Sequence, residues 1–404
     1  MKPHYKPFLR RGIALAFFFL APLVLFAQYT LIPDPNFEQA LIDLGIDSDG
    51  VVNGQVLTSD IETVVALDVR FKNINDLTGI EDFAALEELE LRGNNLTTLD
   101  MSGNTQLRVL NCLANPLLTI NVTQNLLLES LDLSVLHRLD EIDLSQNINL
   151  ETLIMNGCWI KSIDLSHNIN LKNLYAEGSD LLEIDLSNNL LLEFLDVFGV
   201  ELESLDVSNN ILLKELYCGN HGGVDNQTIS ELDLSNNSNL EVFHAENLFL
   251  IESLNLKNNN NDNLLVTLSC VYGDEPCQLT ELQCIEVDDP QAGNNNEFPY
   301  STWYIDAEFY YSEDCALGTT DFWNETDITL YPNPTADGLV LATSNGVAIS
   351  EVRLVDINGR LLEVLEFHID KEVSIDVSHL ASGIYFLRIK DDNGTSMMKK
   401  FIKQ

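Results

Sequence analysis

The sequence repeats itself about every 21 residues over half of its length. The hexapeptide I-D-L-S-H-N at Ile163–Asn168 returns as I-D-L-S-N-N at Ile184–Asn189. Between such copies runs a second pattern, L-x-x-L-x-L-x-x-N-x-L, which is cleanest from Leu107. Both alternate apolar and polar residues, as short extended segments with one buried face do. Stacked coils about 4.8 Å apart would bury these leucines against each other, so the pattern predicts an elongated solenoid.

Ten predicted coils begin at equivalent apolar positions, namely Val64, Leu86, Leu107, Leu128, Leu150, Leu171, Leu192, Leu213, Leu240 and Leu265. Eight coils carry an Asn at one position, which we expect to hydrogen-bond buried backbone groups: Asn104, Asn125, Asn147, Asn168, Asn189, Asn210, Asn237 and Asn259. A row of aspartates must be solvated or bind cations, because like charges repel. It comprises Asp100, Asp143, Asp164, Asp185, Asp206 and Asp233, with Asn121 and Asn255 completing it.

The predicted fold is mostly β, a solenoid with a short α-helical N-terminal cap and a small C-terminal antiparallel β-sandwich. Its domains are a signal peptide at 1–27, an N-terminal cap at 28–63, the solenoid at 64–259, a C-terminal cap at 260–315, a linker at 316–326 and the β-sandwich at 327–404.

Each cap has its own expected parts. In the N-terminal cap, Pro33–Gly45 predicts a helix with Phe37, Leu41 and Leu44 on one face. In the C-terminal cap, Leu279–Asp289 contains the expected last strand. An aromatic lid is predicted from Trp303, Tyr304, Phe309, Tyr310 and Tyr311.

The N-terminus is typical of a secretory signal. Four basic residues precede the 15-residue apolar segment Gly12–Phe26, which is short for a membrane span. We expect cleavage after Ala27, with an uncleaved anchor as the alternative, and no membrane span once the signal is removed. With 63 acidic and 21 basic residues the net charge is −42, which disfavours nucleic acid and anionic lipid as partners.

The seven cysteines fit an exported protein with few disulfides. Two bridges are expected, Cys270 with Cys277 and Cys284 with Cys315. Cys112, Cys158 and Cys218 occupy inward positions and should be buried thiols. Because no C-x-x-C occurs, a zinc or redox site has no support.

No catalytic motif is present, and the seven histidines have no spaced partners for a metal or a triad. The loop Gly45–Gly54 hints at calcium, but an EF-hand alignment places Gly45 and Val56 where carboxylates are required, which favours a plain turn. The sequence therefore predicts no enzyme, no metal site and no cofactor, with calcium on the aspartate row as the open alternative.

Binding is expected where the coils differ, on the outward positions of the L-x-x-L-x-L strands. Aromatic rings and carboxylates gather there over four consecutive coils and suit sugars, peptides or cationic groups. The candidate residues are Tyr175, Glu177, Asp196, Phe198, Tyr217, His244 and Glu246. The insertion His221–Gln227 should overhang them. An ordinary solvated strand face is the alternative.

The repeats at Val64–Asn259 resemble the leucine-rich-repeat family, and Val64–Leu89 is similar to internalin-type repeats. The flanking segments, which include "NFEQALIDLGIDSDG" and "CIEVDD", resemble a bacterial extracellular subclass. This resemblance implies a solenoid that binds an extracellular protein or glycan on its concave sheet, without enzymatic activity.

The tail resembles the C-terminal sorting domain of type IX (Por) secretion. The resemblance lies in "LYPNP" with Tyr331, Pro332, Asn333 and Pro334, in "SGIYFLRI" with Gly383 and Tyr385, and in the terminal "KKFIK" with Lys399 and Lys400. It implies export by that machinery from a Gram-negative bacterium, after which the protein is anchored at the outer surface or released. A structural, calcium-bridged component of a surface coat or matrix remains the alternative function.

Overall fold

The computed structural model describes residues 28–220, 229–272, 275–276, 279–315, 328–343, 349–356, 361–369, 372–391 and 396–404. The signal peptide at 1–27, the insertion 221–227, the linker 316–326 and Cys277 lie outside the described residues. So do the turns Asn358-Gly359 and Asn393-Gly394, which the sequence places between strands of the tail.

The N-terminal cap closes the first coil with a helix and a two-stranded sheet. Strand β1 (Tyr29–Leu31) pairs antiparallel with β2 (Gln55–Leu57), and helices α1 (Pro35–Asp43) and α2 (Thr58–Ile61) complete the cap. The Asp34 carboxylate caps α1 by accepting the N–H of Asn36 and Phe37. Gly45 ends the helix with φ +70°.

The predicted apolar face of this helix is confirmed in part. Phe37 and Leu41 are fully buried, and the Phe37 ring stacks on Phe83. Leu44 is 47% exposed, because it is the C-cap residue where the chain already leaves the helix. Its predicted place on the buried face is therefore wrong.

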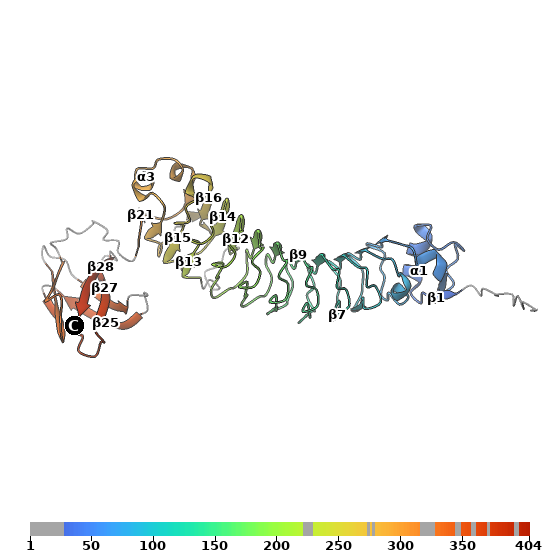
Figure 1. Cartoon of the computed structure of the whole chain (residues 1–404), viewed down its shortest axis with the longest axis horizontal. Helices are drawn as coiled ribbons and strands as arrows, with labels where there is room; N and C mark the ends of the chain where they lie inside the picture. The colour runs from blue at the N-terminus through green and yellow to red at the C-terminus, as the bar shows by residue number, and fades with distance from the viewer. Residues whose placement is uncertain are drawn as a thin grey trace, which may run out of the picture.

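One long parallel sheet runs the length of the solenoid (Figure 1), which is gently bowed with this sheet along its upper edge. In order, its strands are β3 (Ala66–Asp68), β4 (Glu88–Glu90), β6 (Val109–Asn111), β8 (Ser130–Asp132), β9 (Thr152–Ile154), β10 (Asn173–Tyr175), β11 (Phe194–Asp196), β12 (Glu215–Gly219), β14 (Val242–Glu246), β16 (Leu265–Ser269) and β20 (Tyr304–Ile305). The predicted solenoid is confirmed.

The last predicted coil start needs a correction. Leu265 pairs with Val242, so the residue equivalent to Leu240 is Asn263 and not Leu265. Val266 and Leu268 are the buried apolar residues of this strand, whereas Leu265 is 50% exposed. The predicted start is two residues too late, because the preceding loop differs in length from those of the other coils. A shift by an even number of residues keeps the same residues on the inward face, so the apolar alternation did not reveal it.

The I-D-L-S side of the coils forms strands at its two ends. Near the N-terminus β5 (Thr98–Asp100) pairs with β7 (Thr119–Asn121). Near the C-terminus the order is β13 (Glu231–Asp233), β15 (Ser253–Asn255), β19 (Cys284–Glu286) and β21 (Tyr310–Ser312). The predicted strand in Leu279–Asp289 is confirmed as β19, but β21 lies outside it, so β19 is not the last.

Short elements connect these strands. They are the 3-10 turns η1 (Ile80–Asp82), η2 (Asn261–Asn263) and η3 (Tyr300–Thr302), helix α3 (Pro290–Asn294), and the pair β17 (Val271–Tyr272) and β18 (Glu275–Pro276).

A column of buried asparagines joins successive coils. The Asn168 side chain donates to the carbonyl oxygens of Leu144 and Asn147, at 3.2 and 2.9 Å. Seven members are confirmed at 0% exposure: Asn104, Asn125, Asn147, Asn168, Asn189, Asn210 and Asn237. The eighth is Asn258, which donates to the Asn237 carbonyl, and not the exposed Asn259. In the first seven members the side-chain Oδ1 atom has no hydrogen-bond donor among the described residues. The Nδ2 groups therefore make the hydrogen bonds that link neighbouring coils.

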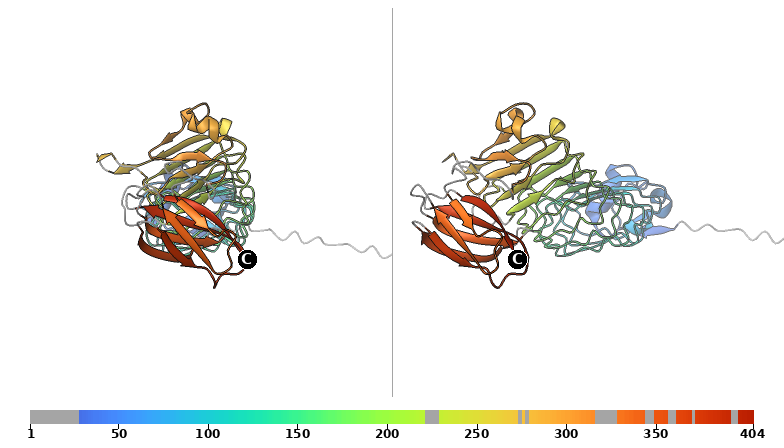
Figure 2. Two further views of the ribbon diagram at one scale, coloured as in Figure 1. Left: turned by 90° about the vertical axis from the view of Figure 1, so that its left-hand side faces the viewer. Right: turned by 60° about the vertical axis from the view of Figure 1, so that its left-hand side comes forward.

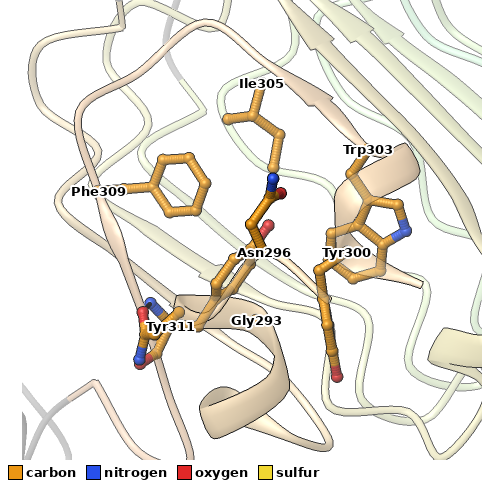
Figure 3. Close-up of a pocket in the computed structure, with 8 residues that line it drawn as sticks. Gly293, Asn296, Tyr300, Trp303, Ile305, Phe309 and Tyr311 are labelled. Atoms are coloured by element: carbon orange, nitrogen blue, oxygen red, sulfur yellow. Dashed lines mark hydrogen bonds between the residues drawn. The ribbon is translucent and has the colours of Figure 1, made fainter. Parts of the chain in front are cut away.

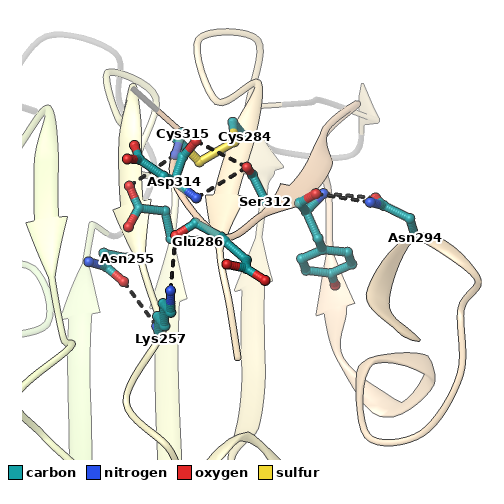
Figure 4. The surroundings of a disulfide bond; sticks show 10 residues. Asn255, Lys257, Cys284, Glu286, Asn294, Ser312, Asp314 and Cys315 are labelled. Atoms are coloured by element: carbon teal, nitrogen blue, oxygen red, sulfur yellow. Dashed lines mark hydrogen bonds between the residues drawn. A yellow bond between two sulfur atoms is a disulfide. The ribbon is translucent and has the colours of Figure 1, made fainter. Parts of the chain in front are cut away.

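The cysteines behave as the sequence predicts wherever they are described. Cys284 and Cys315 form a disulfide that ties β19 to the end of the cap (Figure 4). Cys112, Cys158 and Cys218 are free and buried. Burial raises the pKa of Cys218 to about 12, so this thiol is unreactive. Cys270 is disulfide-bonded, but the pairing with Cys277 is not tested because Cys277 is not described.

The C-terminal domain is a β-sandwich, visible beside the solenoid in Figure 2. One antiparallel sheet has the order β22 (Ile328–Tyr331), β23 (Gly338–Thr343), β26 (Glu372–Asp376). The other has the order β25 (Leu361–Ile369), β24 (Ile349–Asp356), β27 (Gly383–Asp391), β28 (Ser396–Lys403). Leu341 from the first sheet and Leu354, Leu387 and Phe401 from the second share one core. Within the described ranges, no helix has the length and apolarity to span a bilayer.

Candidate functional site

Four neighbouring strands of the main sheet bring the predicted binding residues together. The in-register pairing of β10, β11, β12 and β14 aligns one outward row of Tyr175, Asp196, Tyr217 and His244. A second outward row follows it, and Gly219 and Glu246 are paired there. The residues between these rows, such as Ala176 and Cys218, point into the core and are fully buried. Alternation therefore separates the core from the candidate site.

The aromatic side chains on this face form a continuous string. The Phe194 ring lies 4.4 Å from Tyr175 and 5.6 Å from Tyr217, measured between ring centroids. His244 continues the string at 5.8 Å from Tyr217 and 6.4 Å from Phe198. All five rings are partly exposed. We call Tyr175, Phe194, Tyr217, His244 and Phe198 the aromatic string.

Sequence reasoning missed Phe194. It precedes the buried Leu195 on β11, in a third outward row that the sequence prediction did not consider. The signal was available, because alternation places the residue on either side of each buried strand leucine outward. The ring bridges Tyr175 and Tyr217, which lie on the two coils that flank it, so it connects Tyr175 to the rest of the string.

Carboxylates surround these rings. The Tyr217 hydroxyl donates to Glu215 at 3.0 Å. Burial, and then the neighbouring Glu215, raise the pKa of Tyr217 above its ordinary value. His244 Nε2 lies 3.4 Å from a Glu246 carboxylate oxygen, and Asp196 accepts the N–H of Phe198 at 3.0 Å. The face thus offers ring edges, a hydroxyl and several acceptors.

Gly219 makes a close approach of two strands possible beside the string. Its φ is +106°, and a Cβ on it would lie 2.1 Å from the carbonyl oxygen of Glu246. Any side chain here would therefore push β14 away from β12. The glycine leaves room in the second outward row between Phe198 and Glu246.

A ladder of charges borders the sheet on the side where the strands begin. Lys172 pairs with Glu151 at 2.9 Å, and Lys214 pairs with Glu193 at 2.6 Å. These side chains are 39–50% exposed, so solvent screens each pair and its contribution to stability is small. Both lysines are already paired with glutamates, so the remaining charged residues around the aromatic string are predominantly acidic.

The aspartate row is organised by hydrogen bonds. Asp164 accepts the backbone N–H of Ser166, and Asp100, Asp143, Asp185, Asp206 and Asp233 do the same for the residue two positions on. The serine hydroxyl and N–H lower the pKa of Asp164, so it is ionised at neutral pH. Within the part of the chain that is described, no group of three or more His, Cys, Asp or Glu side chains is placed to hold a metal ion.

The loop Gly45–Gly54 has the turn structure that its sequence favours. Asp47 accepts the N–H of Asp49, and Asp49 accepts that of Val51. The buried Glu38 carboxylate accepts the backbone N–H groups of Asn53, Gly54 and Gln55. Burial raises the pKa of Asp47, which is 5% exposed.

The predicted aromatic lid surrounds a crevice of about 260 Å³ in the C-terminal cap (Figure 3). Tyr300, Trp303 and Tyr311 are at most 9% exposed and pack on one another. The Trp303 Nε1–H donates to the Leu264 carbonyl, so this ring closes the solenoid. Tyr304 is 58% exposed, and neither it nor Tyr310 lines the crevice, which corrects the prediction for both residues. Sequence reasoning also missed Tyr300.

The tail motifs meet in space. The Asn333 side chain contacts the backbone of the terminal strand β28 at Lys400 and Ile402. Tyr385 stacks on Phe401, and its hydroxyl donates to the Ala381 carbonyl. Gly383 pairs with Lys403 at the end of the same hairpin.

Residues 329–404 match the family model described as the secretion system C-terminal sorting domain. No curated protein matches the chain in sequence.

Several solved structures of Listeria monocytogenes proteins are similar to the chain. The functional domain of InlJ is 18% identical, with 93% of this chain and 98% of that one covered and a TM-score of 0.41. The internalin InlF is 19% identical over 73% and 97%, with a TM-score of 0.44. Internalin C2 is 20% identical over 65% and 98%, with a TM-score of 0.39. Likeness at this level assigns no role to any residue here.

Proposed function

We propose that this leucine-rich-repeat protein with a type IX sorting tail binds a protein or glycan partner through the aromatic string of its main sheet. The string itself carries the proposal: five partly exposed rings from four adjacent coils are in contact. The fold does not require aromatic residues at outward positions, and most other coils place small or polar residues there. Aromatic clusters on a surface are typical of binding sites.

The tail makes this a secreted or cell-surface protein. We assign its export to the type IX machinery of a Gram-negative cell, after which the protein acts on the outer surface or in the medium. The proposal concerns binding alone and assigns no catalytic role to these residues.

The test is binding of the purified chain to arrays of extracellular glycans and peptides. Replacing Tyr175, Tyr217 and His244 by Ala should weaken capture by at least about tenfold, because hot-spot rings contribute about 2 kcal/mol or more. A matched control replaces Glu88 and Asn111, outward residues on the same sheet three or more coils away. Unchanged capture by the triple variant, or equal loss in the control, contradicts the proposal. Loss on calcium chelation alone supports the structural, calcium-bridged alternative.

A further inference from the structure

The two ends of the sorting domain are joined by one side chain. Asn333 Nδ2 donates to the Lys400 carbonyl at 2.9 Å, and Asn333 Oδ1 accepts the Ile402 N–H at 2.9 Å. A neighbouring strand would make the same pair of bonds to residues i and i+2. The carboxamide of Asn333 therefore substitutes for a backbone peptide group on β28.

Thr335 extends this contact to the end of the chain. Its N–H donates to the Ile402 carbonyl at 2.9 Å, and its carbonyl accepts the Gln404 N–H at 2.8 Å. The Thr335 hydroxyl donates to Gly338 and the residue is 2% exposed, so the segment is held in place. Because β28 is the edge strand of its sheet, this contact covers part of an edge that would otherwise pair with other chains.

The covered edge still presents side chains to solvent. Alternation along β28 buries Phe401 and Lys403, which are 0% and 8% exposed. Lys400 and Ile402 point to the opposite face, where Lys400 is exposed and Ile402 is 41% exposed. Asn333 lies against both residues and is itself exposed. Segments 67 residues apart thus form one surface with a cation, an aliphatic group and a carboxamide.

Charge separates this surface from the rest of the protein. Residues 329–404 contain 8 basic and 10 acidic side chains, a net of −2, whereas the whole chain carries −42. An acidic partner would be repelled by the solenoid far more than by the tail. A partner that offers a carboxylate to Lys400 should therefore approach the sorting domain and not the solenoid.

We propose that the secretion machinery recognises Asn333, Lys400 and Ile402 as one composite surface, through a partner site that is acidic beside an apolar pocket. This inference rests on the proposed export by the tail. The Y-P-N-P and K-K-F-I-K motifs are then two halves of one signal, and Asn333 is the positioning residue that joins them.

The experiment follows export of the full-length chain from the producing bacterium, by the amount in medium and on the cell surface. Lys400→Glu reverses the charge but leaves the backbone contacts of Asn333 in place, and should lower export about tenfold, as loss of one charged contact does. Lys390→Glu is the matched control on the same face of the hairpin, opposite Ser396 and away from Asn333. Its export should equal that of the parent.

Asn333→Ala tests whether the Asn333 side chain holds the two motifs together. In the purified protein it should speed hydrogen exchange of the Ile402 amide, whereas Lys400→Glu should not. The double variant should be exported no worse than the poorer single variant, because both changes damage one surface.

Normal export of Lys400→Glu, or an equal loss with Lys390→Glu, overturns the composite surface. Multiplicative losses in the double variant overturn it too, since they indicate two separate signals. Deleting residues 396–404 tests the premise that the tail directs export, separately from the composite surface. Export that survives this deletion contradicts the tail as an export signal.

Discussion

Asn125 donates a hydrogen bond from its side chain to the backbone carbonyl of Asn104, its counterpart one coil earlier, at 2.7 Å. The same amide donates to the Met101 carbonyl at 3.0 Å. One carboxamide thus serves two buried carbonyls from the preceding coil. Repetition of this contact links the coils into one cooperative body.

Replacing a central member of this column should be costly. Asn168→Ala removes the side-chain donors to the Leu144 and Asn147 carbonyls, which keep only one backbone N–H each, so the free energy of unfolding should fall by about 1–3 kcal/mol. Urea titration of the purified protein measures it. The control is Asn170→Ala, whose side chain bonds a carbonyl at the surface and should cost less than about 1 kcal/mol. An equal loss of unfolding free energy in the two variants would show that the buried asparagines stabilise the fold no more than exposed ones.

The aspartate row should make stability depend on pH on the acid side. The pKa of Asp164 is lowered from its ordinary value of 3.8, so its stabilisation is present above that value and is lost as pH falls through the folded-state pKa. Asp164→Asn keeps an acceptor for the Ser166 N–H, as Asn121 does naturally for Thr123. The variant's unfolding midpoint should therefore change less between pH 5 and pH 2 than the parent's. Identical pH profiles would exclude this role.

Gly219 should tolerate no side chain. Gly219→Ala places a Cβ against the Glu246 backbone and should destabilise the protein by about 2–4 kcal/mol, because β12 and β14 must separate. Gly157→Ala is the matched control: its φ is +61° but nothing lies within 4 Å of the new Cβ, so only the backbone cost of about 1–2 kcal/mol remains. Thermal melting compares them. A control as unstable as Gly219→Ala would contradict the steric explanation.

The cap disulfide should stabilise the solenoid against unfolding. Cys284 and Cys315 enclose a loop with a sequence separation of 31. Replacing both by Ser should lower the free energy of unfolding by about 3–4 kcal/mol in the chain-entropy model. Reductant should destabilise the parent in the same direction, whereas the buried thiols Cys112, Cys158 and Cys218 give no reason for a further effect. An unchanged unfolding midpoint in the double variant would rule out this contribution.

Local periodicity was enough to predict the solenoid, because each coil uses the same alternation and the same Asn. It failed where coils differ in length. Asn258 replaces Asn259 in the column, and Asn263 replaces Leu265 as a coil start, because loop length hides the register that backbone pairing sets. Leu44 and Tyr304 were misplaced for a related reason: each lies at an element end, where periodicity no longer governs direction.

By itself, the amino-acid sequence determined the repeating coil, most of the buried column and the sorting-domain motifs of the tail, since each depends on spacing within a few residues. Tertiary structure alone decided that Phe194 bridges Tyr175 and Tyr217, and that Asn333 reaches Lys400 across 67 residues. Both contacts join segments whose distance in space is set by stacking and strand pairing. The spacing of residues along the sequence does not predict the distance between these segments, because that distance is set by side-chain packing in the folded chain.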